Sequence, residues 1–295
     1  MKSIYENKKV VSSGSQYDFA QRLTLYETTK QDFILEVTNY TQTIKLKDKT
    51  FMYTIGLKKP SMFVGYRMIE TDLKNLQDTT KLEKVLNTVK KEDCKFYTTK
   101  YSLVPVYKEK AICIDLNNAY ATILFNEGFI SKETKDYLLK LDKPERLAAV
   151  GMLATQKNIY YYNDGQITDI EIKENKYRPL FFYLVQICSK IMGAVEQKYL
   201  NAWFFTWVDG IYLDVDKIKK EEYLNIPNLL LEYYSINSKI EYLQKFDLQR
   251  VDKNIKVNFE KYNEKKQNWK LKTFNFPDPN MIINVNKLIN TNNND

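Results

Sequence analysis

Residues 112–120 read ICIDLNNAY, an apolar run that leads into a single acidic residue, Asp115. Residues 204–213 read FFTWVDGIYL and place Asp209 in a similar way, after apolar and aromatic residues that favour a β-strand. Each stretch therefore predicts a buried strand with one carboxylate at its end. If the two strands are neighbours, the side chains of Asp115 and Asp209 point to one place and can bind divalent cations together.

The segments around these stretches alternate between strand and helix patterns. We expect strands or hairpins at residues 110–115, 160–172, 203–214, 239–243, 255–259 and 269–276, and helices at 117–125, 131–141, 142–153, 179–200 and 217–234. The pairs Asp164-Gly165 and Asp209-Gly210 are expected at hairpin turns. This order predicts an α+β fold in which helices cover one face of an antiparallel sheet.

A small α+β module is expected before residue 110. Residues 33–38, 43–46, 50–55 and 61–66 are rich in β-branched and aromatic residues and read as strands, while the leucines and valines between 73 and 89 have helical spacing. Residues 1–17 are expected to be a loose arm. The predicted organisation is an N-terminal module at 1–109, a second domain at 110–276 and an Asn-rich tail at 277–295.

The composition limits the possible chemistry. The chain has no histidine and its three cysteines are far apart, which excludes His-based triads and His-ligated zinc and argues against disulfides. No signal peptide or membrane-spanning run is expected, so the chain is predicted to be cytoplasmic, in a reducing compartment, with no membrane partner. Catalysis would have to use carboxylates with a metal ion, or Lys, Arg, Tyr or Cys side chains.

The net charge of +8 suits a polyanionic partner such as nucleic acid. The 23 tyrosines suit base stacking as well. An AT-rich genome, which enriches Lys, Asn, Ile and Tyr, explains both features equally, so the two interpretations stay open.

Two-metal nucleotidyl transfer is a chemistry that needs carboxylates and no histidine. Its carboxylates hold two Mg²⁺ ions roughly 3.5–4 Å apart, and Mg²⁺ prefers oxygen ligands. The helix expected after Asp115 begins near Asn118 and Ala119, where exposed N–H groups suit a phosphate. Taken singly, Asp115 also reads as a helix cap and Asp209 as a turn residue.

The first stretch resembles motif A of the family B DNA polymerases, which reads D-x-x-S-L-Y-P. Asp115 and Tyr120 match its Asp and Tyr, whereas its Ser, Leu and Pro are absent. The second stretch is similar to motif C, Y-x-D-T-D-S, with Asp209 at the second Asp and Trp207 in place of the first. By this resemblance Tyr120 is the steric gate that excludes a 2′-hydroxyl, and the carbonyl of Leu116 completes the metal site.

Motif B of that family reads K-x-x-x-N-S-x-Y-G. Only its Lys and Gly are matched, by Lys143 and Gly151, and Arg146 lies one helical turn after the lysine. The resemblance implies that Lys143, with Arg146, contacts the incoming triphosphate. The Tyr and Asn of the motif that contact the template are absent.

The resemblance covers about residues 110–270 and implies an antiparallel polymerase palm with shortened fingers at about 128–176. The implied ligands of two Mg²⁺ or Mn²⁺ ions are Asp115, Leu116 and Asp209. The implied nucleotide contacts are Asn118, Ala119, Tyr120, Lys143 and Arg146.

The implied activity is that of a DNA-directed DNA polymerase, acting on primer–template DNA and dNTPs in DNA replication. No exonuclease domain is recognisable before residue 110, and too little chain follows the palm for a thumb. Synthesis is therefore expected to be distributive, or to need protein partners that supply a thumb or processivity. A phage or mobile element of an AT-rich host is the expected origin.

Two other functions stay open. The departures from motifs B and C also fit a catalytically eroded polymerase-like protein that acts as a nucleic-acid-binding or structural subunit. A two-metal nuclease would use the same carboxylates with further acids, for which Glu171, Glu196 and Asp214 are available.

Overall fold

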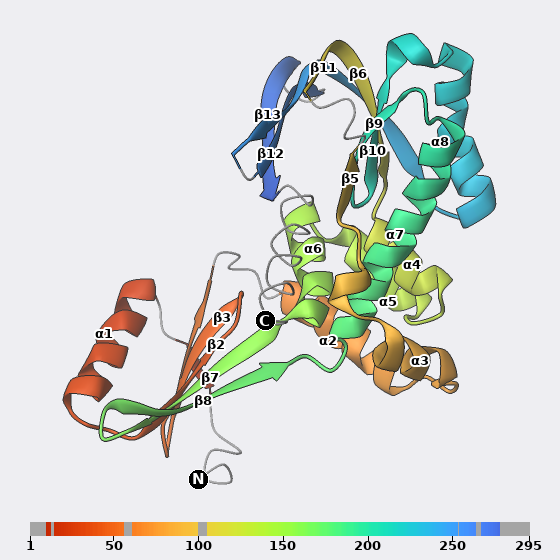
Figure 1. Ribbon diagram of the computed structural model, residues 1–295. Coiled ribbons are helices and arrows are strands. Elements are labelled where there is room, and N and C mark those ends of the chain that lie inside the picture. Colours follow the sequence, from red (N-terminus) through yellow and green to blue (C-terminus); the bar gives the residue numbers. More distant parts are fainter. Residues whose placement is uncertain are drawn as a thin grey trace, which may run out of the picture. The chain divides into compact units, whose positions relative to one another are not determined.

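The computed structural model describes residues 10–12, 15–55, 61–99, 105–252, 254–263 and 267–277 (Figure 1). The fold is α+β, as the sequence predicts, and the described strands pair in an antiparallel manner except for β1 and β4. Contacts divide the chain into two units: unit 1 comprises residues 1–92 and 124–184, and unit 2 comprises residues 93–123 and 185–295. These interleaved units differ from the expected segments 1–109 and 110–276. The expected tail, apart from Pro277, lies outside the described residues.

Unit 1 contains a six-stranded sheet in which N-terminal strands pair with a hairpin from the middle of the chain. In spatial order the strands are β1 (Val10–Ser12), β4 (Thr50–Thr54), β3 (Thr41–Lys45), β2 (Phe33–Val37), β7 (Gln156–Asn163) and β8 (Gln166–Glu174). The strands expected near residues 33, 43 and 50 and the hairpin at residues 164 and 165 are confirmed. The pairing of β2 with β7 joins a hairpin expected in the fingers to the N-terminal strands.

One face of this sheet packs against α1 (Gln16–Thr28). The helix begins after Ser15, whose hydroxyl accepts a hydrogen bond from the N–H of Asp18, so residues 15–17 are not part of a loose arm as expected. The core between helix and sheet consists of Phe19, Tyr26, Phe33, Leu35, Ile44, Leu46, Phe51 and Tyr162.

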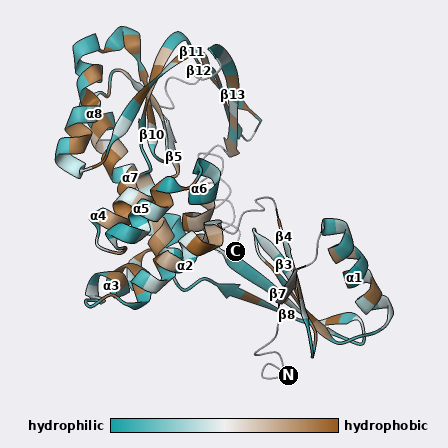
Figure 2. Cartoon of the chain, turned by 180° about the vertical axis from the view of Figure 1, so that it is seen from behind, coloured by the Kyte–Doolittle hydropathy of each residue, from teal (hydrophilic) through white to brown (hydrophobic). Residues whose placement is uncertain are grey.

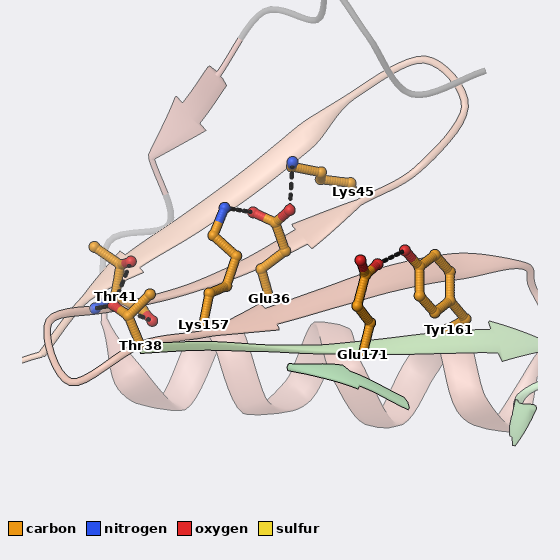
Figure 3. Close-up of polar contacts among 7 residues, drawn as sticks. All are labelled: Glu36, Thr38, Thr41, Lys45, Lys157, Tyr161 and Glu171. Carbon is orange, nitrogen blue, oxygen red and sulfur yellow. Dashed lines mark hydrogen bonds and ion pairs between the residues drawn. The ribbon is translucent and has the colours of Figure 1, made fainter. Parts of the chain in front are cut away.

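The opposite face carries a cluster of polar contacts that joins neighbouring strands (Figure 3). Glu36 on β2 accepts hydrogen bonds from Lys45 on β3 at 2.7 Å and from Lys157 on β7 at 3.0 Å. Burial raises the pKa of Glu36, but the two lysines outweigh burial and lower the pKa below its usual value. Tyr161 on β7 donates to Glu171 on β8 at 2.8 Å. These bonds help to hold β3, β2, β7 and β8 in register.

Residues 61–66 begin a helix, so the strand expected there is wrong. The helix is α2 (Ser61–Lys74), and the expected helix across 73–89 is divided between α2 and α3 (Thr80–Thr88). The apolar residues of α2 recur every three or four positions, which places them on one helix face. The buried members of this face are Met62, Gly65, Ile69 and Leu73.

Gly65 allows three helices of unit 1 to pack closely. It meets both α5 (Lys132–Lys140) and α6 (Lys143–Gly151), since a Cβ on Gly65 would lie 3.0 Å from Leu138 and 3.2 Å from Ala149. Asp72 near the end of α2 accepts hydrogen bonds from the N–H and hydroxyl of Ser131, which caps α5. These helix contacts override the local β-propensity of residues 61–66.

Gly165 in the β7–β8 turn offers a test of stability with a matched control. Gly165 has a φ of +74°, and a Cβ there would clash with the carbonyl oxygen of Glu27. Gly128, also in unit 1, has a φ of +78°, but a Cβ there would meet nothing within 4 Å.

We expect Gly128→Ala to lower the free energy of unfolding by about 1 kcal/mol through backbone strain alone. Gly165→Ala should cost about 2 kcal/mol more, because the backbone at Glu27 must move. Thermal unfolding followed by circular dichroism measures both losses, and equal losses would contradict the role of the Glu27 contact.

Unit 2 contains a seven-stranded antiparallel sheet. In spatial order the strands are β13 (Asn268–Pro277), β12 (Asn254–Asn263), β11 (Ser238–Val251), β6 (Val106–Leu116), β10 (Gly210–Asp214), β9 (Trp203–Trp207) and β5 (Tyr97–Thr99). The strand expected at residues 110–115 is confirmed, as are all the strands expected from residue 203 onward. Strands β6 and β11 are longer than expected. Short 3-10 helices also occur, at Lys91–Asp93, Met152–Ala154 and Val215–Lys217.

Helices also belong to the described part of unit 2. They are the beginning of α4 (Ala119–Asn126), the part of α7 (Arg178–Lys198) from residue 185 onward, and α8 (Lys220–Tyr234), which continues through Pro227. In Figures 1 and 2, α7 and α8 lie on one side of β9 and β10, whereas β12 and β13 curl round on the other side.

The concave face of this sheet is filled with aromatic side chains. The ring centroid of Phe276 on β13 lies 4.4 Å from that of Tyr97 on β5 and 5.5 Å from that of Phe205 on β9. Because β13 and β5 are the two ends of the sheet, these contacts close a curled half-barrel around an aromatic core.

Among the described helices, α7 is long and apolar enough by length and composition to cross a membrane, which the sequence reading did not anticipate. Leu184, Val185 and Cys188 on this helix nevertheless have no exposed surface inside the protein. Such burial is typical of a core helix. The expected cytoplasmic location stays a prediction.

Candidate functional site

Asp115 and Asp209 come together because β6 pairs with β10. Asp115 is the next-to-last residue of β6 and lies opposite Gly210, the first residue of β10. Asp209 directly precedes Gly210, and its carbonyl oxygen accepts a hydrogen bond from the N–H of Leu116 at 2.9 Å. The two aspartates therefore lie at the same end of neighbouring strands.

The turn between β9 and β10 is shifted by one residue from the expected position. It consists of Val208 and Asp209, and Val208 has a φ of 44°, which is rare for a β-branched residue. Gly210 belongs to the sheet instead. A Cβ on Gly210 would lie 3.3 Å from the sulfur of Cys113 and 3.7 Å from Oδ1 of Asp115. The glycine thus keeps space beside the Asp115 carboxylate.

Directly paired residues form a row across the sheet that includes Asp115. From β5 to β11 its members are Tyr97, Trp207, Gly210, Asp115 and Lys239. Paired residues of antiparallel strands point to the same face, so this row lies on the concave face. Gly210 therefore lies between Trp207 on one side and Asp115 on the other, and Lys239 is the neighbour of Asp115 beyond it.

Trp207 is half-buried and packs against the aromatic core. Its ring stacks on that of Tyr97, with 5.9 Å between centroids, and on that of Phe274, with 5.6 Å. The resemblance to motif C assigns an acidic residue to position 207. A carboxylate among these rings would lose the stacking contacts and much of its hydration. The curl of the sheet therefore explains why tryptophan suits this position.

Lys239 on β11 forms an ion pair with Asp115. Its Nζ lies 3.0 Å from Oδ2 of Asp115 and 2.7 Å from Oε1 of Glu241, and Nζ of Lys261 lies 2.5 Å from the same Glu241 oxygen. Burial lowers the pKa of Lys239, but Glu241 and Asp115 outweigh burial and raise the pKa above its usual value. Burial raises the pKa of Glu241, and the two lysines more than offset burial and lower it. Lys239 is thus a charged ammonium with two carboxylate partners.

Tyr120 lies in the first turn of α4, shortly after Asp115 in the chain. Burial is the main cause of its raised pKa, and the nearby Cys188 and the charge of Asp209 contribute further. Tyr120 follows Asp115 by five residues, across the short connection from β6 to α4. The strand, the turn and the helix start therefore bring Asp115, Tyr120 and Asp209 into one region of unit 2.

Asn118 and Ala119 make the sharp connection from β6 to α4. Asn118 is exposed and has a φ of 53°, a conformation that Asn adopts more readily than most residues. Its carbonyl accepts the hydrogen bond of the Thr122 N–H at 3.1 Å, and Ala119 is buried. The first N–H groups of α4 consequently begin only a few residues after Asp115.

Lys143 and Arg146 lie on α6 in unit 1. Lys143 is exposed, whereas Nη1 of Arg146 donates to the carbonyl of Leu141 at 2.9 Å. Burial lowers the pKa of Arg146. The other predicted site residues belong to unit 2, so a nucleotide contact shared with Lys143 and Arg146 stays a prediction.

The acids considered for a nuclease contact other side chains. Asp214 is buried at the far end of β10 and forms an ion pair with Lys108 at 2.6 Å. Glu196 on α7 accepts a hydrogen bond from Thr98, and Glu171 belongs to unit 1. Among the described residues, no group of three or more His, Cys, Asp or Glu side chains is placed to hold a metal ion.

Sequence reasoning missed Lys239 and Glu241. Their alternation around Ile240 does indicate a strand with one charged face. Nothing in that segment points to Asp115, however, because the partner depends on the register of β11 against β6.

No protein-family model matches the chain, and a search of curated proteins finds no significant match. The geometry and the motifs of unit 2 are therefore the basis for a functional proposal.

Proposed function

We propose that unit 2 is the catalytic palm of a DNA-directed DNA polymerase in which Asp115 and Asp209 bind Mg²⁺. The pairing of Asp115 with Gly210 carries this proposal, because it puts both aspartates at one end of neighbouring strands. The helix that starts just after β6, with Tyr120 in its first turn, supports it further.

The available donors suit Mg²⁺ or Mn²⁺. Asp115, Asp209 and the carbonyl of Leu116 supply hard oxygen ligands, and Mg²⁺ commonly takes one or two carboxylates together with waters and substrate phosphates. A cluster of three acidic side chains is therefore not required. When bound, the ions lower the pKa of the primer 3′-hydroxyl and neutralise charge on the leaving pyrophosphate.

Lys239 competes with a metal ion for the carboxylate of Asp115. Its ammonium already lies 2.7 Å from Glu241, so Lys239 keeps one carboxylate partner when it gives up the other. Until then, the ion pair holds the Asp115 side chain in place on the concave face. By the resemblance, Tyr120 limits the sugar site.

A second candidate is a nucleic-acid-binding or structural protein that has lost catalysis. Two observations favour it: Trp207 packs against the aromatic core where motif C has an acid, and Lys239 already neutralises Asp115. Such a protein would bind DNA in a salt-sensitive way without needing Mg²⁺. We rank this function second because the chain has an aspartate at both proposed metal-binding positions, and because Gly210 leaves space beside Asp115.

Primer extension separates these functions. The full chain is incubated with a 5′-labelled primer annealed to a template, with dNTPs, and with Mg²⁺, Mn²⁺ or EDTA. We expect metal-dependent and template-directed addition of a few nucleotides per binding event.

If neither metal supports extension and electron paramagnetic resonance detects no bound Mn²⁺, the polymerase function is wrong and the binding function takes its place. Shortening of the primer without dNTPs would instead identify a nuclease.

A further inference from the structure

Strand β8 stands at one end of the sheet in unit 1. One side of it pairs with β7, and none of the described strands pairs with its other side. The N–H of Ile170 donates to the side chain of Asp169 on the same strand, at 2.8 Å, which places this N–H on the open side. The backbone groups of Ile172 and Glu174 face the same way, because their direction alternates along a strand. The open edge of β8 therefore offers hydrogen-bonding groups to a further strand.

The open edge also carries exposed isoleucines on the face of the sheet that holds α1. Ile170 lies opposite Tyr160 of β7, which lies opposite Leu35 in the core beneath α1. Ile172, two positions further along, points to the same face. These two isoleucines are nevertheless 56% and 62% exposed. An apolar strand with an unpaired edge is a template for pairing with another chain.

The other face of β8 carries charges that are unevenly neutralised. Glu171 accepts a hydrogen bond from Tyr161 at 2.8 Å (Figure 3). Lys173 is exposed and lies opposite Lys157, which forms an ion pair with Glu36. Within the described part of the chain, Lys173 has no carboxylate at ion-pair distance. A carboxylate from outside the sheet would offset the repulsion between Lys173 and Lys157.

Two copies of β8 are complementary when they run antiparallel with Ile172 opposite Ile172. Glu171 of each copy then lies opposite Lys173 of the other, which gives two opposite-charge pairs on one face. On the other face, Ile170 of each copy is a diagonal neighbour of Ile172 of the other. The two adjacent registers would place Glu171 opposite Glu171 or Lys173 opposite Lys173, and like charges directly opposite are unfavourable.

We propose that β8 pairs with β8 of a second copy of this chain in that register, so that two unit 1 sheets become one continuous sheet. The two-fold interface uses the same surface of both copies, so each attraction occurs twice and both open edges are closed. One pair of strands is a small interface, and we expect a dissociation constant of about 1–100 µM. The dimer depends on unit 1 alone and requires no catalysis in unit 2.

Sedimentation velocity of the full chain at about 1 to 100 µM measures the dimer, because weak association is concentration-dependent in this range. We expect a shift from monomer to dimer as the concentration rises. Ile172→Lys places two ammonium groups together at the two-fold axis and should weaken the dimer about tenfold or more.

Leu271→Lys is the matched control. Leu271 is 63% exposed on β13, which is an end strand of the other sheet. The same exchange of an exposed aliphatic side chain for lysine should leave the dimer unchanged there.

Exchange of charges tests the register. Lys173→Glu gives a copy with two glutamates on this face, and Glu171→Lys gives a copy with two lysines, so each variant opposes like charges in its own dimer. Each variant alone should be monomeric at concentrations where the wild-type chain is dimeric. An equimolar mixture should dimerise again, because the glutamates of one variant then lie opposite the lysines of the other.

A wild-type chain that stays monomeric over the whole range would overturn the proposal, as would a mixture of the charge variants that does not dimerise. A dimer that survives Ile172→Lys but is lost in Leu271→Lys would place the contact on β13 instead. Circular dichroism identifies any variant that has lost its fold. If the dimer forms while primer extension fails, the polymerase function alone is wrong.

Discussion

Asp115→Asn and Asp209→Asn each lower metal-dependent primer extension by about 10³-fold or more. Each exchange removes a charged ligand and with it several kcal/mol of transition-state stabilisation, at about 1.4 kcal/mol for every factor of ten. Asn has nearly the shape of Asp, and Lys239 keeps Glu241 as a partner, so the fold should persist. Single-turnover extension of a labelled primer at saturating dNTP measures the loss.

Asp216→Asn is the matched control for these variants. Asp216 is exposed in the same unit, just after β10, and takes no part in the proposed site. Its exchange should leave extension within about twofold of the wild-type rate, as for most surface changes. Wild-type rates in Asp115→Asn and Asp209→Asn would show that the assignment of the two aspartates is wrong. Unchanged melting temperatures would exclude unfolding as the cause of lost activity.

Phe205→Ala destabilises unit 2 by about 3–5 kcal/mol, the usual cost of removing a buried aromatic side chain. Phe205 has no exposed surface, and its ring centroid lies 5.1 Å from that of Tyr212 and 5.5 Å from that of Phe276. Phe276 belongs to the strand at the opposite end of the sheet. The cavity would therefore remove packing that holds the two ends of the curled sheet together.

Urea unfolding followed by tryptophan fluorescence measures this effect in unit 2 alone. All three tryptophans of the chain, Trp203, Trp207 and Trp269, lie in that unit. Phe205→Leu should lose less stability than Phe205→Ala, because it fills more of the cavity. Tyr233→Ala, at a side chain that is 72% exposed on α8, should change stability by no more than about 0.5 kcal/mol. A loss below about 1 kcal/mol in Phe205→Ala would mean that the aromatic core does not stabilise the curl.

Local patterns predicted most of the strands and hairpins, because side-chain alternation and turn residues act over a few neighbouring positions. The failure at residues 61–66 has a physical cause. Their β-branched and aromatic residues favour a strand locally, but the contacts of Gly65 with Leu138 and Ala149 reward a helix. The pairing of β2 with β7 was also beyond local patterns, because it joins segments that are far apart in the chain.

The candidate site was partly predictable for the same reason. Asp115 and Asp209 stand out because each follows an apolar run, and Tyr120 stands out through the motif it resembles. The ion pair between Lys239 and Asp115 was not predictable, because it depends on a register between strands from separate parts of the chain. The stacking of Trp207 on Phe274 likewise depends on the curl of the whole sheet.

The sequence by itself determined that the chain is α+β, that it lacks histidine chemistry, and that two carboxylates end strand-like segments. These properties belong to composition or to short stretches of chain. Only the tertiary structure decided that Gly210 lies between Trp207 and Asp115, and that Lys239 neutralises the carboxylate. It also decided that four lysines line a hollow that adjoins this row. Strand order and register make these neighbours, and both are set by side-chain packing summed over the whole sheet rather than by any one segment.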